Sequence, residues 1–229
     1  MMKKIVMISI VLLALIAQVN LANAVNLLAN GSFETGDLTG WQTSGTQLAY
    51  PIAVILTDGV AGSAFGEAIP PDTIIGGSPD PAGTHGAYFV DDIANQVLSQ
   101  SIFLTAGSYE IGFDTYAPRN GFNNQFTATF SGTIANVLLA NFDVHLENNP
   151  QIWVHYSGIA NVSVAGTYQV AFNYVTLGAP AADVVVDRVY IASSDEDGGT
   201  PIPTPEPAAM MLLGLGLIGL AGVKRTLDR

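Results

Sequence analysis

The sequence contains no cysteine. This absence excludes disulfide bridges, cysteine-ligated zinc sites and thiol catalysis together. A chain of 229 residues without covalent cross-links must be stabilised by its hydrophobic core, which a bound metal ion can supplement.

Basic residues are also scarce, because seven Lys and Arg residues stand against 19 Asp and Glu residues. Five of the seven lie close to the two chain ends, so Arg119 and Arg188 are the only Lys or Arg residues between residues 25 and 207. The same stretch holds 18 acidic residues and has a net charge of −16. Such a surface repels nucleic acid and anionic lipid headgroups, whose binding depends on Lys and Arg. The composition therefore predicts no nucleic-acid partner and favours neutral glycans or divalent cations.

The first 24 residues have the order of a secretory signal peptide. Lys3 and Lys4 precede an apolar stretch at residues 5–17, and Ala22-Asn23-Ala24 forms a small-residue cleavage site. A permanent anchor is the less favoured interpretation, because the stretch is shorter than the ~20 residues that a membrane-spanning helix requires. We therefore expect residues 1–24 to be removed and the exported chain to begin at Val25.

The C-terminal region predicts a linker followed by a membrane segment. Residues 195–207 are acidic and then proline-rich, which is typical of a stiff spacer. Residues 208–223 are an unbroken apolar run, short for a hydrocarbon layer of about 30 Å. Lys224 and Arg225 can reach the headgroups and hold the C-terminus in the cytoplasm. Residues 208–229 are thus predicted to be a transmembrane helix with a basic tail.

Pro205-Glu206-Pro207, the apolar segment and the pair Lys224-Arg225 together resemble the PEP-CTERM sorting signal of Gram-negative bacteria. The resemblance covers residues 205–229. It implies that a membrane enzyme, exosortase, recognises and processes this tail in organisms that make extracellular polysaccharide. The chain would then be anchored in the inner membrane before processing, and reach the cell surface or extracellular matrix afterwards. An ordinary C-terminal anchor is the alternative.

Between the ends, at residues 25–194, the sequence has the pattern of β-strands. Apolar and polar residues alternate at 109–114 and 168–173, the period of half-buried strands, and a glycine turn precedes each segment. No long segment outside the termini has helical periodicity. We therefore predict an all-β domain, an antiparallel β-sandwich of jelly-roll type. Further strands are expected at 53–57, 87–90, 101–105, 126–130, 135–139, 152–156 and 184–191.

Asn30-Gly31-Ser32-Phe33-Glu34, the following Gly40-Trp41 and the last predicted strand resemble the opening and closing segments of galactose-binding-like jelly rolls in carbohydrate-binding modules. In that family an early Glu and the first Asp of a closing Asp-Asp-Val pattern help to bind structural calcium. The resemblance therefore implies calcium at Glu34 and Asp187. Arg188 stands where the second Asp would be, and a cation there can replace calcium by an ion pair. The alternative is that Glu34 caps a turn and Asp187 pairs with a neighbour.

No catalytic motif is present. No serine lies in the Gly-x-Ser-x-Gly pattern of a nucleophilic hydrolase, and His85, His145 and His155 are isolated in the sequence. Asp91 and Asp92 form an adjacent pair, but neighbours on a strand point to opposite faces, which favours solvation or a loop cation. Because carboxylates are plentiful, a glycosidase pair is the alternative.

Aromatic side chains are the candidates for sugar contact, because their faces suit the apolar faces of pyranose rings. Trp41 and Tyr116, nearest the predicted loops, are the first choices, and the others are Tyr50, Phe122 and Trp153. The long Gly-, Pro- and Asp-rich segment at residues 58–86 is expected to carry the binding site. The predicted function is non-enzymatic: an exported β-sandwich that binds neutral or calcium-bridged polysaccharide or serves structurally. The alternative is an extracellular glycan-cleaving enzyme.

Overall fold

The computed structural model describes residues 25–60, 67–74, 76–145 and 151–194. The chain divides into two units, Met1–Ser194 and Asp195–Arg229, and every described residue belongs to the first. The predicted signal peptide, linker and C-terminal helix, with the sorting motif, lie outside the described residues. Over the ranges that the structure describes, no helix has the length and apolar character needed to cross a membrane.

The described residues form ten β-strands and one short helix. In chain order these are β1 (Gln42–Thr46), β2 (Ala53–Leu56), β3 (His85–Phe89), β4 (Asn95–Leu104), β5 (Gly107–Tyr116), α2 (Arg119–Phe122), β6 (Ala128–Ile134), β7 (Val137–Asp143), β8 (Trp153–Val162), β9 (Gly166–Thr176) and β10 (Val184–Ser193).

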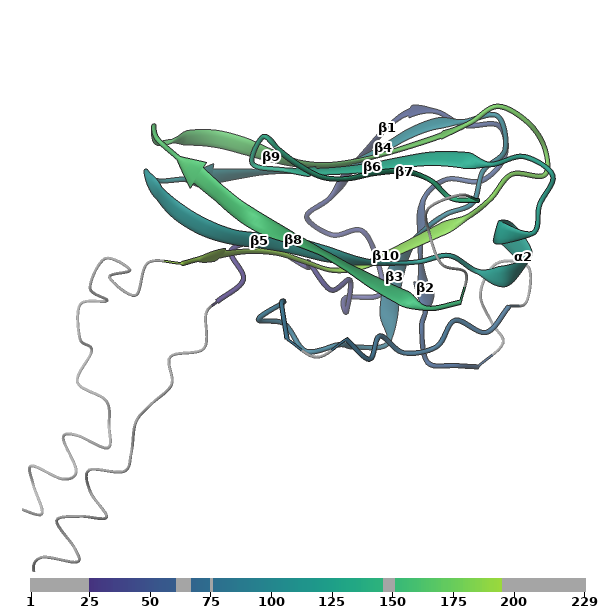
Figure 1. The fold of residues 1–229 in the computed structure, drawn as a ribbon, viewed down its shortest axis with the longest axis horizontal. Helices are drawn as coiled ribbons and strands as arrows, with labels where there is room; N and C mark the ends of the chain where they lie inside the picture. Colours follow the sequence, from purple (N-terminus) through teal and green to yellow (C-terminus); the bar gives the residue numbers. More distant parts are fainter. Residues whose placement is uncertain (1–24, 61–66, 75, 146–150, 195–229) are drawn as a thin grey trace, which may run out of the picture. The chain divides into compact units, whose positions relative to one another are not determined.

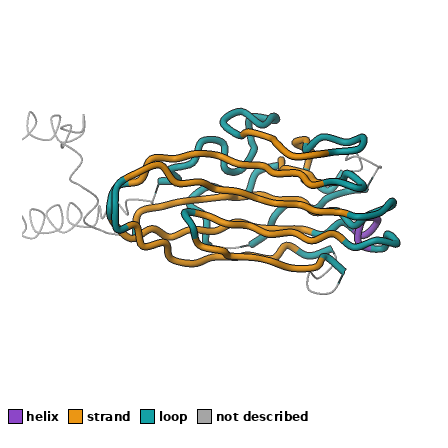
Figure 2. The backbone as a smooth tube through the Cα atoms, turned by 90° about the horizontal axis from the view of Figure 1, so that it is seen from above, coloured by secondary structure: helices purple, strands orange, loops and turns teal. Residues whose placement is uncertain are grey.

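The strands form two antiparallel sheets that pack face to face (Figure 1). Sheet A has the order β1-β4-β9-β6-β7 and sheet B the order β2-β3-β10-β5-β8. The pairs β3–β10, β4–β9, β5–β8 and β6–β7 are those of a long hairpin rolled into two sheets, which is the jelly roll. β1 and β2 extend one edge of each sheet. The predicted fold class is therefore confirmed, and Figure 2 shows the strands running along the length of the sandwich.

Aromatic residues dominate the core between the sheets. The alternation predicted for β9 is observed, since Val170, Phe172 and Tyr174 are buried and the residues between them are partly exposed. Phe172 meets Phe113 of β5 edge to face, with ring centroids 4.9 Å apart. Gly132 leaves room for this pair, because a Cβ at that position would collide with the Phe113 ring.

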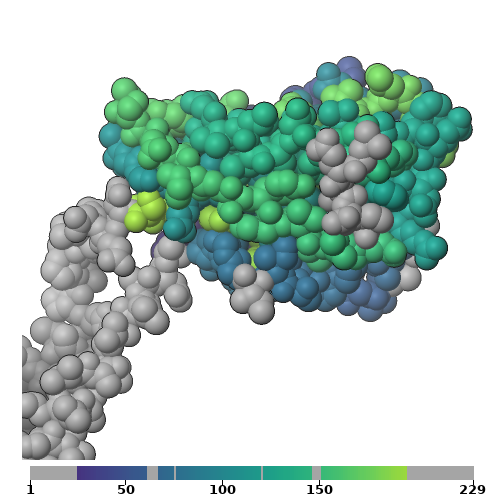
Figure 3. All heavy atoms as spheres, in the orientation of Figure 1, coloured from purple at the N-terminus to yellow at the C-terminus, as the bar shows by residue number. Residues whose placement is uncertain are grey.

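A long connection between β2 and β3, residues 57–84, crosses the outer face of sheet B (blue in Figures 1 and 3). We call its described residues the covering segment. Ile69 packs with Tyr88, Tyr116 and Val185 into a second, smaller apolar cluster, which Ile55 and Trp153 border. The indole nitrogen of Trp153 donates to the carbonyl oxygen of Pro70 across 3.0 Å. This connection, predicted as the loop that carries a binding site, therefore mainly covers a sheet.

Candidate functional site

The two side chains predicted to contact sugar lie inside the protein. Trp41 is 7% exposed, its ring stacks on Phe33 at 5.4 Å, and its Nε1 donates to the carbonyl oxygen of Asn30. Tyr116 is 2% exposed and packs against Trp153 beneath the covering segment. The exposed stacking faces expected at Trp41 and Tyr116 are therefore absent, because the core encloses one ring and the covering segment the other.

Glu34, one of the two predicted calcium ligands, joins the N-terminal loop to the start of β3. Its Oε1 accepts hydrogen bonds from the backbone N–H groups of Thr84 and His85, at 2.8 and 2.9 Å. Its Oε2 lies 3.4 Å from Nδ1 of His85. These contacts agree with the turn-capping alternative, and they leave Oε2 as the freer oxygen for a cation.

Asp187, the second predicted calcium ligand, is completely buried in β10. Its Oδ1 accepts a hydrogen bond from the backbone N–H of Arg188, whereas Oδ2 has no hydrogen-bond partner. Burial, with smaller contributions from the charges of Asp72 and Glu34, raises the pKa of Asp187 to about 8. A buried, unpaired carboxylate oxygen of this kind would be stabilised by a cation.

The two residues alone do not complete a calcium site. Calcium takes about six to eight oxygen ligands. Among the described residues no group of three or more His, Asp or Glu side chains is arranged to hold a metal ion. Calcium at Glu34 and Asp187 would therefore also require backbone carbonyl oxygens or water, and the site stays a proposal.

Arg188 stands where the closing Asp-Asp-Val pattern of galactose-binding-like jelly rolls has its second Asp, and it makes contacts that an acid could not make. Its guanidinium is buried and donates to the carbonyl oxygens of Ile74 and Gly76 in the covering segment. It also lies 3.5 Å from Asp114 and 3.7 Å from Asp72. Arg188 thus fastens the covering segment to sheet B.

His155 lies beside this cluster, with Nδ1 2.5 Å from Oδ1 of Asp114. Burial, and secondarily the charge of Arg188, lower the pKa of His155. The opposite edge of its ring faces Gly77, where any Cβ would crowd the imidazole. The other two histidines are placed differently, since His85 contacts Glu34 and His145 packs against Phe122. No histidine lines the pocket described next.

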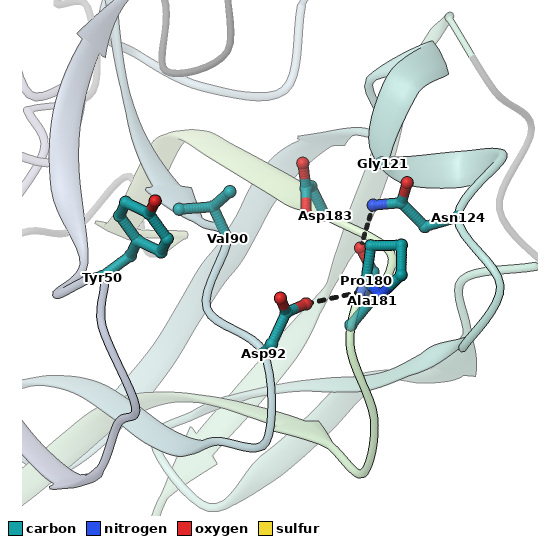
Figure 4. A pocket seen from close by; sticks show the side chains of 8 residues that line it. All are labelled: Tyr50, Val90, Asp92, Gly121, Asn124, Pro180, Ala181 and Asp183. Carbon is teal, nitrogen blue, oxygen red and sulfur yellow. Dashed lines mark hydrogen bonds between the residues drawn. The ribbon is translucent and has the colours of Figure 1, made fainter.

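A pocket of about 300 Å³ opens at the end of the sandwich where α2 lies (Figure 4). We call it the end pocket. It forms where four connections converge: β1–β2, β3–β4, the region of α2, and the loop before β10. Its lining residues are Tyr50, Val90, Asp92, Gly121, Asn124, Pro180, Ala181 and Asp183.

The adjacent acids Asp91 and Asp92 have different roles at the end pocket, and only Asp92 lines it. Asp91 is buried and accepts the backbone N–H groups of Leu48, Ala49 and Tyr50, which fixes the loop that carries the Tyr50 ring. Asp92 turns to the pocket and accepts the backbone N–H of Ala181 at 2.6 Å. The two carboxylates therefore act separately, one as a loop anchor and one as a pocket wall.

Tyr50 and Asn124 lie on opposite sides of the end pocket in Figure 4, with Asp92 and Asp183 between them. Tyr50 is 45% exposed, so part of its ring is open to solvent. The side-chain amide of Asn124 donates to the carbonyl oxygen of Ala181, which leaves its own carbonyl oxygen as an acceptor.

Asp183 is the most buried acid in the lining, at 4% exposed. Its Oδ2 accepts a hydrogen bond from the hydroxyl of Tyr88 at 2.6 Å, and the described residues offer none to Oδ1. Burial, and then the charges of Asp92 and Glu67, raise the pKa of Asp183 to about 7. A Cβ at Gly121 would collide with this carboxyl, so the glycine is needed where α2 approaches it.

The sequence pointed to part of this pocket. Tyr50 was a candidate for sugar contact and Asp92 a member of the conspicuous acid pair, whereas Asn124, Pro180 and Asp183 carried no recognisable signal. Their positions depend on which loops the jelly roll brings to the same end.

Comparison with protein families identifies the C-terminal signal. Residues 203–225 match the family model of the PEP-CTERM protein-sorting motif. The matched range contains Pro205, Glu206, Pro207, Lys224 and Arg225, the residues on which the resemblance was based. The chain thus carries a PEP-CTERM motif, which implies an exported and sorted protein. The comparison with curated proteins found no match.

Several solved structures resemble the domain. The module TmCBM61, determined with β-1,4-galactotriose, has a TM-score of 0.48 and 18% identity, over 74% of this chain and 99% of that one. The adhesin domain of Lys-gingipain from Porphyromonas gingivalis has a TM-score of 0.46 and 13% identity, over 72% and 96%. A cyclase from Fischerella has a TM-score of 0.45 and 16% identity, over 73% of this chain and 96% of that one. A fold does not determine a function, so the function is argued from the site.

Proposed function

We propose that this protein is an exported, non-catalytic glycan-binding domain, and that the end pocket is its ligand site. The observation that carries the proposal is the pairing of a half-exposed aromatic ring, Tyr50, with the hydrogen-bonding groups of Asn124 and Asp92 in one pocket. A pyranose presents an apolar face and a rim of hydroxyl groups. The Tyr50 ring can stack on the apolar face, and the polar groups of Asn124 and Asp92 can hydrogen-bond to the hydroxyl groups.

The charge of the domain narrows the class of glycan. The acids Asp92 and Asp183 line the end pocket, and the lining contains no Lys or Arg. A uronic acid would meet repulsion from both carboxyls, which salt screens only weakly inside a pocket. The proposed ligands are therefore polysaccharides without negative charge, or acidic ones whose charge calcium bridges.

The geometry of the domain suits display on a surface. Both ends of the described chain lie together, because Leu27 donates to Ile191 and Ser194 donates to Ser108 through backbone hydrogen bonds. The end pocket lies beyond the opposite end of β10, whose ten residues span about 33 Å. A domain held through the residues after Ser194 would thus keep its pocket distant from the point of attachment. In this proposal exosortase processes the tail, and the domain then functions at the cell surface or in the polysaccharide matrix.

A glycan-cleaving enzyme is the second candidate. Asp183 supports it, because a buried carboxyl with a pKa near 7 resembles the general acid of a glycosidase, and Asp92 lies in the same pocket. Release of reducing ends from the host's exopolysaccharide would support this candidate and contradict the proposal.

The test is binding of the full chain, in mild detergent, to neutral and uronic-acid-rich polysaccharides on an array. We expect binding to neutral polymers without turnover, and a loss of roughly tenfold in affinity for Tyr50→Ala. Phe103→Ala is the matched control, because Phe103 is an aromatic residue, 66% exposed, in β4 and outside the pocket. Absence of glycan binding would leave a purely structural role.

A further inference from the structure

The end pocket has an unbalanced charge. Asp92 and Asp183 both line it, and Glu67 lies close enough to contribute to the raised pKa of Asp183. Neither of the two arginines of the domain neutralises this negative charge in the pocket. The guanidinium of Arg188 is buried against Asp114 and the covering segment, and Arg119 is not part of the lining.

Asp183 is the group that most needs a partner. It is more than nine-tenths buried, and Oδ1 receives no hydrogen bond from the described residues. Burial of the residue disfavours the ionised form of its carboxyl, so a donor or a positive charge that enters the pocket would stabilise that form. A ligand hydroxyl would supply a donor alone. A ligand ammonium group would supply both a donor and a charge.

The other lining groups suit an ammonium on a sugar. An ammonium has three N–H donors, and the pocket offers acceptors on Asp183, Asp92 and Asn124. The Tyr50 ring can pack on the apolar face of the sugar or interact with the cation. A volume of about 300 Å³ is at the lower end for small-molecule sites and suits a single sugar residue.

We propose that the end pocket selects a sugar residue with a free primary amine, a de-N-acetylated hexosamine, whose ammonium group binds between Asp92 and Asp183. This inference rests on the proposed glycan-binding function and specifies its ligand. N-acetylation removes the charge and two of the three donors, and it adds an acyl group, so acetylated residues bind more weakly. Uronic acids are rejected by the same carboxyls.

Isothermal titration of the full chain in mild detergent tests the proposal with two matched probes, chitotriose and its fully N-acetylated counterpart, at pH 7.5. Charge-assisted hydrogen bonds are about twice as strong as neutral ones, so we expect the amine form to bind at least tenfold more tightly. Asp183→Asn should reduce this ratio to near one and preserve the weaker binding of the acetylated form. Asp92→Asn is a second variant, in case the first does not fold.

Two controls separate site binding from general attraction to an acidic protein. Glu110→Gln removes one carboxylate of β5 outside the end pocket and should leave the ratio unchanged. Trilysine, a cation without a sugar ring, should bind more weakly than chitotriose. Equal affinity for the two probes would overturn the inference but preserve the proposed function. No binding of either would overturn the inference, and the polysaccharide array would then decide the proposed function. A preference for the amine that survives both Asp183→Asn and Asp92→Asn would show non-specific attraction and overturn the inference.

Discussion

Arg188 donates a hydrogen bond across 2.6 Å to the carbonyl oxygen of Ile74, in the segment that covers sheet B. Arg188 is one of only two Lys or Arg residues between positions 25 and 207, and it is buried. Its second contact in the segment is the carbonyl oxygen of Gly76, at 3.3 Å. A residue that breaks the family pattern at the expected calcium site thus fixes the longest connection of the domain.

Replacing Arg188 with methionine should therefore release the covering segment. Asp72 and Asp114 would lose their buried cation, and breaking a buried ion pair costs about 3–5 kcal/mol. Urea unfolding should show that loss, and hydrogen exchange should increase in residues 67–84 before it increases in β4 and β9. The matched control is Arg119→Met on α2, expected to change stability by less than about 0.5 kcal/mol. Equal effects of the two substitutions would contradict this role for Arg188.

The buried acids should make the domain more stable in mild acid than in mild base. The pKa of Asp183 is raised to about 7 and that of Asp187 to about 8, from an ordinary value of 3.8. At a pH between 3.8 and the raised pKa, each carboxyl is protonated in the folded state and ionised in the unfolded state. The stability that it contributes is therefore greatest near pH 4 and falls as the pH rises toward 8. Each carboxyl changes stability by at most about 1.4 kcal/mol per pH unit.

Thermal melting of the full chain from pH 5 to 8.5 measures this trend. We expect Tm to fall steadily over that range, and Asp183→Asn to make the fall shallower, because the amide cannot ionise. A Tm that rises from pH 5 to 8.5 would mean that these carboxyls are not desolvated as the structure describes.

Calcium should stabilise the folded domain if Glu34 and Asp187 hold it. An ion that binds only the folded state adds about 2.7 kcal/mol at a concentration 100-fold above its dissociation constant. The effect should be larger at pH 8 than at pH 5, since calcium competes with the proton on Asp187. Melting curves with chelator and with millimolar calcium measure it. Asp187→Asn should abolish the shift and Glu110→Gln should preserve it, whereas an unchanged Tm in the parent protein would exclude the site.

The protein should be processed at both ends in its native host. The Ala22-Asn23-Ala24 sequence predicts loss of residues 1–24, and the motif at 203–225 predicts loss of the apolar tail. Intact-mass analysis of protein recovered from the cell surface or medium should show both. The Glu206→Ala variant should keep its apolar tail. The Thr200→Ala variant, whose substitution lies outside the matched range, should lose the tail as the parent protein does. A full-length mass for the parent protein would contradict the prediction.

The fold could be predicted because strand periodicity is a local property. The alternating residues of β9 are buried and partly exposed as expected, and the apolar run at 184–191 lies within β10. In β5 the expected inward residues are buried, but only Glu110 of the expected outward residues is exposed, because Gly112 and Asp114 are buried as well. β1 was missed because its five residues, QTSGT, are all exposed at a sheet edge and have no apolar alternation. Edge strands of this kind are recognised only through their partner, here β4.

The site was only partly predictable because it depends on contacts between distant segments. Trp41 and Tyr116 were expected to be exposed from their places near loops, but their exposure is decided by Phe33 and by the covering segment, far away in sequence. Asp183 has no distinctive neighbours in the sequence. Its burial and its position in the end pocket follow from Tyr88 and Gly121, which only the jelly-roll topology brings near it.

Glycan binding in the end pocket is measured by a map of the protein's amide chemical shifts with and without the polysaccharide made by its own host. We expect shifts concentrated at residues 48–50, 90–92, 119–124 and 179–183, and their loss in Tyr50→Ala. Shifts concentrated instead on the outer face of sheet A, at Ser99, Asn173 and Ser131, would contradict it.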